Sequence, residues 1–539
     1  MSAPGDKVVC FFVGVERMYK KLQGKNFIDQ VTRYGFFAEQ FPNCFSSEEF
    51  ANNLSELLPL IPIGKSQKGK GKNITAPTTL SIYKNDISRR VLSVSNPEAF
   101  LRLSKYMSDN WDDILSVSKS PNSLSPITFI RNYGSSEEMI NCESIREILK
   151  AKSDFVIGIK NCIRASLGYK YRLKVDITNC YNSLYTHSIT WAICGKEMAK
   201  SYYRTSKPES IRGLYEIGDF LDCFIRQQKN NETNGIIVGP YTSRIVSEII
   251  LARIDQMLSE KGFKFKRYVD DYKLYFRSET QAQESLPLIE KVLNEFNLTL
   301  NTSKTEMEKY PYEIISQIKE TYDKAKKTDG VFGVLNAAAN LHCKGEKGAY
   351  KYALKYLKDT PIPKDDIQII IPTLVNIMLL DPRYGKYITN YLKQNISIIN
   401  SENLAAVVNR ELSCSLQNEL QQETLMFIQL IKDLNLSITA ENIIKILNSD
   451  NDFAILIALD IWKNFNKSVI RNKHEARLIS ESIKDLMEKL IGEKLSGSRW
   501  LLLYELHVHK LVSDDLLPTL EINDFFHKMF ALNVSFYRG

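Results

Sequence analysis

The sequence predicts a mixed α/β region followed by an all-helical domain. Between about residues 165 and 310, short strand patterns alternate with helical patterns. After Tyr312, glycine and proline thin out and apolar residues recur at helical spacing. At 539 residues the chain exceeds one ordinary domain. We therefore expect an α/β unit and a C-terminal half of paired helices, which form either a HEAT-like array or an irregular bundle.

Each predicted element has its own pattern. YRLKVDI (171–177) predicts a strand that ends in a carboxylate, SRIVSEIILARIDQML (243–258) a helix, and KFKRYVDDYKLYF (264–276) a β-hairpin with an acidic tip. The C-terminal half contains six helical patterns: IIPTLVNIMLL, LAAVVNREL, TLMFIQLIKDL, ENIIKIL, FAILIALDIW and RWLLLYELHVHKL.

The composition is that of a globular protein. It is 44% hydrophobic, 25% charged and 10% aromatic, which excludes collagen-like repeats, coiled-coil fibres and long disorder. A net charge of +8 favours polyanionic partners only mildly. The nine cysteines form no C-x-x-C pair, which fits a reducing cytoplasm and indicates neither a zinc site nor a disulfide framework. The apolar run Val8–Val15 is too short to span a membrane, so we expect no membrane contact.

The segment Pro59–Pro77 predicts an exposed basic loop, because glycines, prolines and lysines interrupt the apolar pattern. Part of it matches the nucleotide-binding pattern G-x-x-x-x-G-K. Gly71 stands where such a loop needs a Ser or Thr hydroxyl, so we reject that interpretation. A solvated loop and a flexible contact to nucleic-acid phosphates both remain open.

Three aspartates suggest chemistry. Asp176 ends an apolar strand, and Asp270 and Asp271 are adjacent in the hairpin. Carboxylates seldom lie against β-branched strands unless a cation offsets their desolvation, and magnesium prefers a few carboxylates in an open site. Two such ions can hold an in-line phosphoryl transfer. Adjacent strand residues face different sides, so we expect Asp176 and Asp270 to bridge the ions and Asp271 to be peripheral.

An Asp pair alone is more typical of an ordinary turn, and the ordered set around it favours the metal site. Tyr181 lies five residues beyond Asp176. A glycine-rich turn, Gly235–Gly239, precedes the predicted helix, and NLTLNTSKTE after the hairpin supplies Lys304.

This order resembles the palm of a reverse transcriptase. DITNCY is similar to motif A, GIIVGPYTSR to motif B, YVDD to motif C and LNTSKTE to motif D. YNSLYTHSITWAICGKE, NETNGIIVGPYTSRIVSEI and RYVDDY more closely resemble the abortive-infection and defence-associated reverse transcriptases of bacteria, the AbiK-like group. The resemblance implies an N-terminal segment packing on the fingers (1–58), fingers (59–165), a palm (166–311) and a helical domain (312–539) without a conventional thumb.

The resemblance also implies residue roles. Asp176, Asp270 and Asp271 would bind two Mg²⁺ ions, for which Mn²⁺ could substitute. Tyr181 would be the steric gate that excludes a ribose 2′-hydroxyl. Gly239 would allow the backbone to approach the incoming nucleotide or the template.

Four further residues complete the set. Ser243 would lie on the small face of the helix after motif B, together with Ser247. Lys304 would stabilise or protonate the leaving pyrophosphate. Arg89 or Arg90 would grip the triphosphate, and the sequence does not distinguish between them.

The resemblance implies a DNA polymerase of antiphage defence that uses dNTPs and assembles as homo-trimers or hexamers. Protein priming by a tyrosine would leave DNA covalently attached, and synthesis would be either template-independent or templated by a dedicated noncoding RNA. Tyr34 and Tyr537 are accessible-looking primer candidates, whereas His187 is expected to be a satisfied core histidine. Pro240 and Tyr241 follow Gly239 where template-copying enzymes usually carry glutamine.

Two alternatives stay open. A conventional RNA-templated reverse transcriptase of retron or intron type would need a thumb and that glutamine. A non-catalytic helical scaffold with a relic palm should have lost a metal-binding carboxylate or the steric gate. The sequence retains all four of these residues: Asp176, Asp270, Asp271 and Tyr181.

Overall fold

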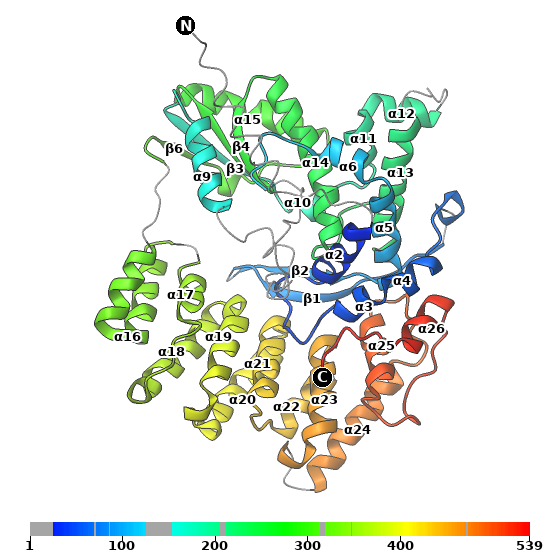
Figure 1. Ribbon diagram of the computed structural model, residues 1–539, viewed down its shortest axis with the longest axis vertical. Coiled ribbons are helices and arrows are strands. Elements are labelled where there is room, and N and C mark those ends of the chain that lie inside the picture. Colours follow the sequence, from blue (N-terminus) through cyan, green and yellow to red (C-terminus); the bar gives the residue numbers. More distant parts are fainter. Residues whose placement is uncertain are drawn as a thin grey trace.

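A computed structural model describes residues 25–68, 72–85, 87–125, 154–204, 212–312, 318–346, 348–469 and 473–539 (Figure 1). The apolar run Val8–Val15, and Lys70 and Gly71 of the rejected nucleotide-binding pattern, lie outside these residues. No helix within the described ranges combines the length and apolarity needed to cross a membrane.

The predicted strand and hairpin form one antiparallel sheet. Its strands are β3 (Tyr171–Asp176), β4 (Lys264–Tyr268), β5 (Asp271–Phe276) and β6 (Glu306–Lys309), in the order β4-β5-β3-β6. Pairing β3 with the hairpin places the three predicted carboxylates at one end of the sheet.

Helices cover this sheet and extend from it. Helix α14 (Tyr241–Glu260) is buried around most of its circumference, since it packs on α6, α11 and α15. Helix α15 (Glu279–Asn294) packs on β3 and β5, and α9 (Asp154–Ala165) on β4. The remaining helices of this region are α10 (Cys180–Ser183), α11 (Ser188–Cys194), α12 (Lys196–Arg204) and α13 (Arg212–Gln227).

A second, two-stranded sheet precedes the first in the chain. Strand β1 (Thr78–Tyr83) pairs antiparallel with β2 (Arg89–Val94). Helices α5 (Pro97–Asp109) and α6 (Trp111–Ser118) follow, and α2 (Lys25–Gly35) packs on α5 and α14. The shorter α3 (Glu48–Asn52) and α4 (Leu54–Leu57) complete the N-terminal part.

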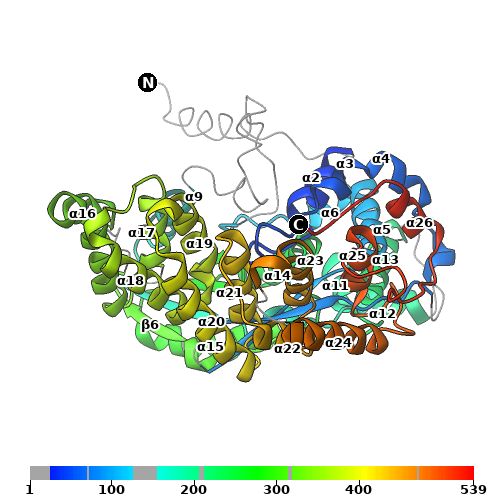
Figure 2. The same ribbon diagram turned by 90° about the horizontal axis from the view of Figure 1, so that it is seen from below.

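The C-terminal half is helical, as predicted. All six sequence patterns lie in helices, and among the described residues from 318 onward there is no strand. The helices form an arc beneath the two sheets, from α16 at one end to α26 at the other (Figures 1 and 2). They are α16 (Ile318–Cys343, kinked at Asp329 and Gly330), α17 (Ala349–Leu357), α18 (Ile367–Leu380), α19 (Gly385–Gln394), α20 (Ser401–Gln417), α21 (Gln421–Asp433), α22 (Ala440–Leu447), α23 (Asp452–Val469), α24 (Lys473–Lys489), α25 (Trp500–His509) and α26 (Asp524–Ala531).

The helical arc is joined to the small sheet through the edge of β1. The outward backbone N–H groups of Ser81 and Tyr83 donate to the side-chain oxygens of Gln421 and Gln422, each at 2.7 Å. These bonds satisfy a strand edge that would otherwise be open to pairing with another chain. Side chains of α21 therefore accept the hydrogen bonds along the edge of β1 that a third strand would otherwise accept.

The chain ends inside this junction. Phe536 stacks on Phe36, at 5.2 Å between ring centroids, and Tyr537 forms a β-bridge with Phe45. The indole N–H of Trp500 points at the carbonyl of Val94 in β2. The buried apolar residues form one continuous core across both halves of the protein.

Candidate active site

The three predicted carboxylates meet at the end of the four-stranded sheet. Asp176 is the last residue of β3 and lies opposite Asp271, the first residue of β5. Tyr268 pairs with Asp271, so Val269 and Asp270 form the two-residue turn between β4 and β5. The antiparallel register thus brings together carboxylates that are about a hundred residues apart in the chain.

Asp176 is also tied to the segment that resembles motif D. Its Oδ2 accepts hydrogen bonds from Lys304 Nζ and from Asn301 Nδ2, each at 3.0 Å. The Asn301 N–H donates to the carbonyl of Asp176 at 2.8 Å. Lys304 is one of the residues predicted from the sequence, whereas Asn301, in the same run NLTLNTSKTE, was not predicted.

The carboxylates disfavour each other's ionised form. Desolvation raises the pKa of Asp271 to about 6, and the charges of Asp270 and Asp176 add to this effect, although its side chain is accessible at the sheet edge. Desolvation raises the pKa of Asp270, and the negative charge of Asp176 raises it further. The positive charges of Arg90 and Lys304 act in the opposite direction. A cation placed here would relieve that repulsion.

A divalent metal fits this donor set. The ligands on offer are carboxylate oxygens, which magnesium prefers, and two of the three face an open cavity. Among the described residues, no three His, Cys, Asp or Glu side chains are already grouped around a position for a metal ion. Lys304 and Asn301 both bond the Oδ2 atom of Asp176, so an ion bound through that oxygen would have to replace them.

A cavity of about 340 Å³ lies in front of the carboxylates, between the two sheets. Seven of the nine predicted site residues line it: Asp176, Asp270, Lys304, Tyr181, Arg89, Arg90 and Gly239. Asp271 and Ser243 do not. The cavity is large enough to hold a small polyanionic ligand between a carboxylate wall and a basic wall.

The structure distinguishes the two arginines of β2. Arg89 donates to both carboxylate oxygens of Glu423, at 2.9 and 2.6 Å, and to the Ser81 hydroxyl at 3.0 Å. Arg90 is exposed and forms no ion pair with any residue that the structure describes. Its charge also acts on Asp270. Arg90 is thus the arginine available to a ligand.

Gly239 is required by the close packing of the turn before α14 against strand β2. Its φ is +142°, and a Cβ atom there would lie 2.6 Å from the carbonyl oxygen of Ser93 in β2. The neighbouring carbonyl of Val238 accepts the Ser93 N–H at 2.7 Å. The close approach at Gly239 is therefore made by the backbone of β2, although the residue also borders the cavity.

The structure does not bring Ser243 to the cavity. Its side chain is fully buried in α14, and its hydroxyl has no hydrogen-bond partner among the described residues. Ser247, one turn further along, donates to the Tyr181 hydroxyl at 3.3 Å. The ring of Tyr181 is therefore held from α14 while it lines the cavity.

The three remaining residues from the sequence analysis have different environments. His187 is satisfied by Asp222 at 2.7 Å, but 41% of its side chain is exposed, so the prediction of a core position is wrong. Tyr537 is 1% exposed and donates to Asp460, so its predicted accessibility is wrong. Tyr34 lines the cavity beside the carboxylates.

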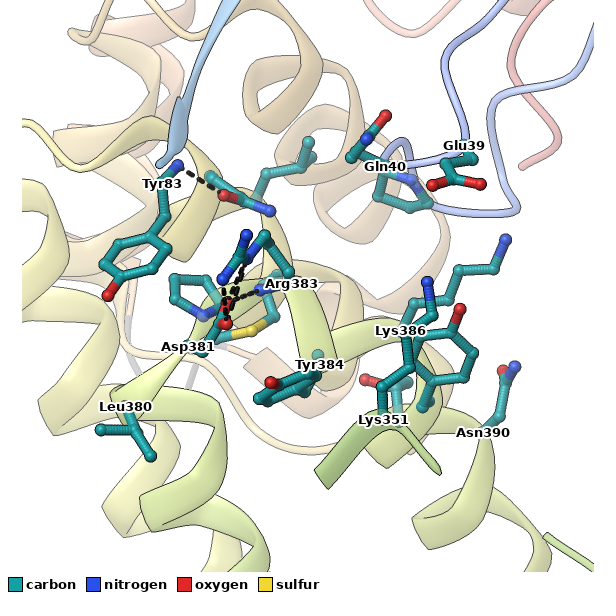
Figure 3. A pocket seen from close by; sticks show the side chains of 18 of the residues that line it. Glu39, Gln40, Tyr83, Lys351, Leu380, Asp381, Arg383, Tyr384, Lys386 and Asn390 are labelled. Carbon is teal, nitrogen blue, oxygen red and sulfur yellow. Dashed lines mark hydrogen bonds and ion pairs between the residues drawn. The ribbon is translucent and has the colours of Figure 1, made fainter. Parts of the chain in front are cut away.

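A larger cavity of about 750 Å³ lies between the N-terminal part and helices α17 to α21 (Figure 3). It shares Glu39 and Gln40 with the first cavity. Its wall carries both signs of charge, including the Arg383–Asp381 ion pair at 2.6 Å. None of the predicted site residues lines it.

Comparison with known proteins identifies one family. Residues 130–317 match the model of reverse transcriptase (RNA-dependent DNA polymerase), a range that contains Asp176, Tyr181, Gly239, the hairpin and Lys304. No curated protein matches the chain in sequence.

Solved structures with similarity to this chain include telomerases from Candida species. A telomerase from Candida albicans in complex with a TWJ fragment of telomeric RNA is 13% identical, with a TM-score of 0.25 over 71% of this chain and 65% of that chain. An apo telomerase from Candida tropicalis is 12% identical, with a TM-score of 0.31 over 84% and 78%. Our chain thus spans slightly less than two thirds of the first of these. At such TM-scores the overlap is too poor to carry a comparison of the folds.

Proposed function

We propose that this protein, a nucleotidyltransferase with a reverse transcriptase domain at residues 130–317, synthesises DNA from dNTPs by metal-assisted phosphoryl transfer in bacterial antiphage defence. One observation carries the chemistry. Asp176, Asp270 and Lys304 line a single cavity together with Arg90 and Tyr181. The role in defence rests on the motifs that resemble the AbiK-like group.

Each side chain has a task in this reaction. Asp176 and Asp270 would hold the metal ions, with Asp271 at their side. When bound, Mg²⁺ lowers the pKa of the attacking hydroxyl and neutralises charge on the phosphates. Arg90 holds the triphosphate from the opposite wall, and Lys304 supplies positive charge or a proton to the leaving pyrophosphate.

The ring of Tyr181 sets the choice of sugar. It borders the cavity, and Ser247 holds its hydroxyl, so the ring can fill the space that a ribose 2′-hydroxyl would need. We therefore propose dNTPs as the substrates, with ribonucleotides excluded by contact.

The proposal extends to priming. Tyr34 lines the same cavity as Asp270, which makes this tyrosine the primer candidate that borders the proposed site of phosphoryl transfer. This supports protein-primed synthesis with DNA attached covalently. The residues Pro240 and Tyr241 after Gly239, in place of the usual glutamine, support synthesis without a conventional template. We further propose a homo-oligomer, a trimer or hexamer, in the cytoplasm.

A second candidate is RNA-templated synthesis. The matched family is described as RNA-dependent DNA polymerase, which favours a dedicated noncoding RNA as template. The two candidates predict different products, because a template imposes a repeated sequence whereas untemplated addition does not.

The test is incorporation of labelled dNTPs. The purified protein is incubated with Mg²⁺ and each labelled dNTP, without added primer or template, before and after RNase. Label that migrates with the protein and is released by protease supports self-primed synthesis. Incorporation that RNase abolishes supports a bound RNA template.

An aspartate-pair comparison makes the test specific. Asp270→Asn with Asp271→Asn should abolish incorporation and leave thermal unfolding close to wild type. The matched control is Asp514→Asn with Asp515→Asn, an adjacent and exposed pair in the helical domain, which should retain full incorporation. Polymerisation by the first double variant would reject the assignment.

A further inference from the structure

We infer that a buried ion-pair network centred on Arg267 positions Asp270 by holding the strained backbone of Val269. This inference rests on the proposed function, because it concerns how a proposed metal-binding carboxylate is aimed. Val269 has a φ of +58° in the two-residue turn between β4 and β5. Only glycine adopts such a conformation freely, and a β-branched residue there is strained.

Both polar groups of Val269 are held by side chains. Its carbonyl oxygen accepts from Arg267 Nη1 at 2.8 Å, and its N–H donates to the Ser125 hydroxyl at 3.1 Å. A strained conformation persists only where its surroundings oppose relaxation. These two contacts fix the peptide units on either side of Val269, one of which leads directly to Asp270.

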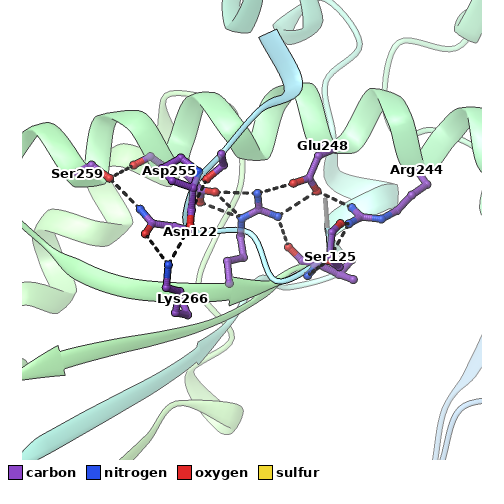
Figure 4. A network of polar contacts seen from close by, with 11 residues as sticks. Asn122, Ser125, Arg244, Glu248, Asp255, Ser259 and Lys266 are labelled. Atoms are coloured by element: carbon purple, nitrogen blue, oxygen red, sulfur yellow. Dashed lines mark hydrogen bonds and ion pairs between the residues drawn. The ribbon is translucent and has the colours of Figure 1, made fainter. Parts of the chain in front are cut away.

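Arg267 is itself held by Glu248 and Asp255, two of the residues labelled in the polar network of Figure 4. It is fully buried, and its guanidinium donates to both oxygens of Asp255 and both oxygens of Glu248, at 2.8 to 3.1 Å. With the bond to Val269, all five N–H groups of the guanidinium are used. The backbone of Arg267 is fixed as well, because its N–H donates to Asn122 and its carbonyl accepts from Leu124.

The second anchor, Ser125, belongs to the same network. Arg244 donates to the Ser125 hydroxyl at 3.0 Å and to its carbonyl at 2.7 Å, while its other terminal nitrogen donates to Glu248 at 2.8 Å. Arg244 and Arg267 balance the charges of Glu248 and Asp255. Burial alone would raise the pKa of Glu248, but the two arginines outweigh it and hold that pKa below the ordinary value.

If its only role were to stabilise the fold, this network would be less favourable in free energy than apolar packing. Buried ion pairs carry a desolvation cost that well-packed apolar side chains of similar volume avoid. This network reaches the metal-binding turn at two atoms of the one strained residue. We therefore assign it a positioning role, in which Arg267 and Ser125 are positioning residues and Asp270 is the group they aim.

Ser125→Ala tests this assignment with little risk to the fold. It removes the acceptor of the Val269 N–H and leaves the ion pairs of Arg267 in place. We expect weaker Mn²⁺ binding by electron paramagnetic resonance and about tenfold or greater loss of kcat, since small misplacements of a reacting group are costly. Thermal unfolding should stay near wild type. The control is Ser118→Ala, a buried serine whose hydroxyl donates to the carbonyl of Leu115 in its own helix.

Val269→Gly provides the decisive second measurement. Glycine adopts positive φ without strain, so in the Ser125→Ala background it should restore Mn²⁺ affinity and kcat towards those of the single Val269→Gly variant. Restoration supports positioning through backbone strain. Wild-type behaviour of Ser125→Ala, or a loss that glycine does not restore, overturns the inference.

The proposed function and the positioning role of the Arg267 network can be rejected independently of each other. If the wild-type protein incorporates no dNTP, the proposed function fails, and Mn²⁺ binding still reports on positioning. If wild-type synthesis is lost with Asp270→Asn but unaffected by Ser125→Ala, the function stands and the positioning role is rejected.

Discussion

Glu423 of the helical arc holds Arg89 of strand β2 through both of its carboxylate oxygens, at 2.9 and 2.6 Å. The two residues are 334 positions apart in the chain. A partly buried, bidentate pair of this kind is strong and directional. It joins the C-terminal half of the protein to the strand that forms one wall of the candidate active site, and it leaves the adjacent Arg90 as the cation facing the carboxylates.

Arg90→Ala should weaken nucleotide binding and leave the fold intact. Loss of a charge-assisted hydrogen bond of about 1.5–3 kcal/mol corresponds to a KM for dNTP that rises about tenfold or more. Arg89→Ala should instead lower the melting temperature, because it leaves Glu423 partly buried without its partner. Steady-state kinetics and calorimetry on both variants distinguish these roles. The assignment would be contradicted if Arg89→Ala raised the KM for dNTP and Arg90→Ala lowered the melting temperature.

Tyr181→Ala should relax sugar discrimination more than it slows dNTP use, since the ring fills the space of a 2′-hydroxyl. The measurement is the ratio of kcat/KM for dNTP and rNTP. Tyr181→Phe is the control, because it keeps the ring and removes the hydroxyl that contacts Ser247. An unchanged ratio in the alanine variant would show that another residue excludes ribonucleotides.

Gly239→Ala should destabilise the protein and reduce activity together. The new Cβ would lie 2.6 Å from the Ser93 carbonyl oxygen, so β2 and the turn before α14 would have to separate beside the cavity. Gly262→Ala is a matched control: its φ is +83°, and a Cβ there meets nothing within 4 Å. We expect about 1–2 kcal/mol of destabilisation at Gly262 from backbone strain. Gly239→Ala should cost about 1–3 kcal/mol more because of the clash. Equal melting temperatures of the Gly239→Ala and Gly262→Ala variants would contradict the predicted clash.

The docked C-terminus should make stability depend on pH. The hydrogen bond to Glu505 raises the pKa of His509 above 6.5, although burial opposes this. A raised folded-state pKa means that the stabilisation is present below about pH 6.5 and is lost as the pH rises through the folded value. Desolvation raises the pKa of Glu505 as well, which acts in the same direction.

The melting temperature should therefore fall between pH 6 and pH 8.5, and His509→Gln should reduce the fall. Glutamine can still bond Ser535 or the carbonyl of Tyr537, which His509 now contacts, but it does not titrate. A variant with the same pH dependence as wild type would place the titrating group elsewhere.

Local patterns in the chain are sufficient for the elements themselves. The alternating apolar residues of β3 and the hairpin, and the helical spacing of α14 and the C-terminal patterns, depend on neighbours a few residues apart. That is why the fold class and the order of the carboxylates could be predicted. The pairing of Asp176 with Asp271 also requires the register that β3 and β5 adopt in the folded sheet.

Contacts between distant segments decide the rest. Arg89 and Arg90 both line the cavity, and Glu423 decides which of them is available to a ligand. The burial of Tyr537 depends on Phe45 and Asp460. Ser243 and Ser247 share a helix pattern, yet only Ser247 meets Tyr181.

The strained turn illustrates the limit of local patterns most directly. Valine in a YVDD hairpin predicts an ordinary strand residue, because β-branched side chains favour extended backbone. Its positive φ is maintained by Arg267 and Ser125, which lie on different segments and converge only in the folded protein. The spacing of side chains along the chain specifies local conformation, whereas a side chain's partner is set by the packing of the whole molecule.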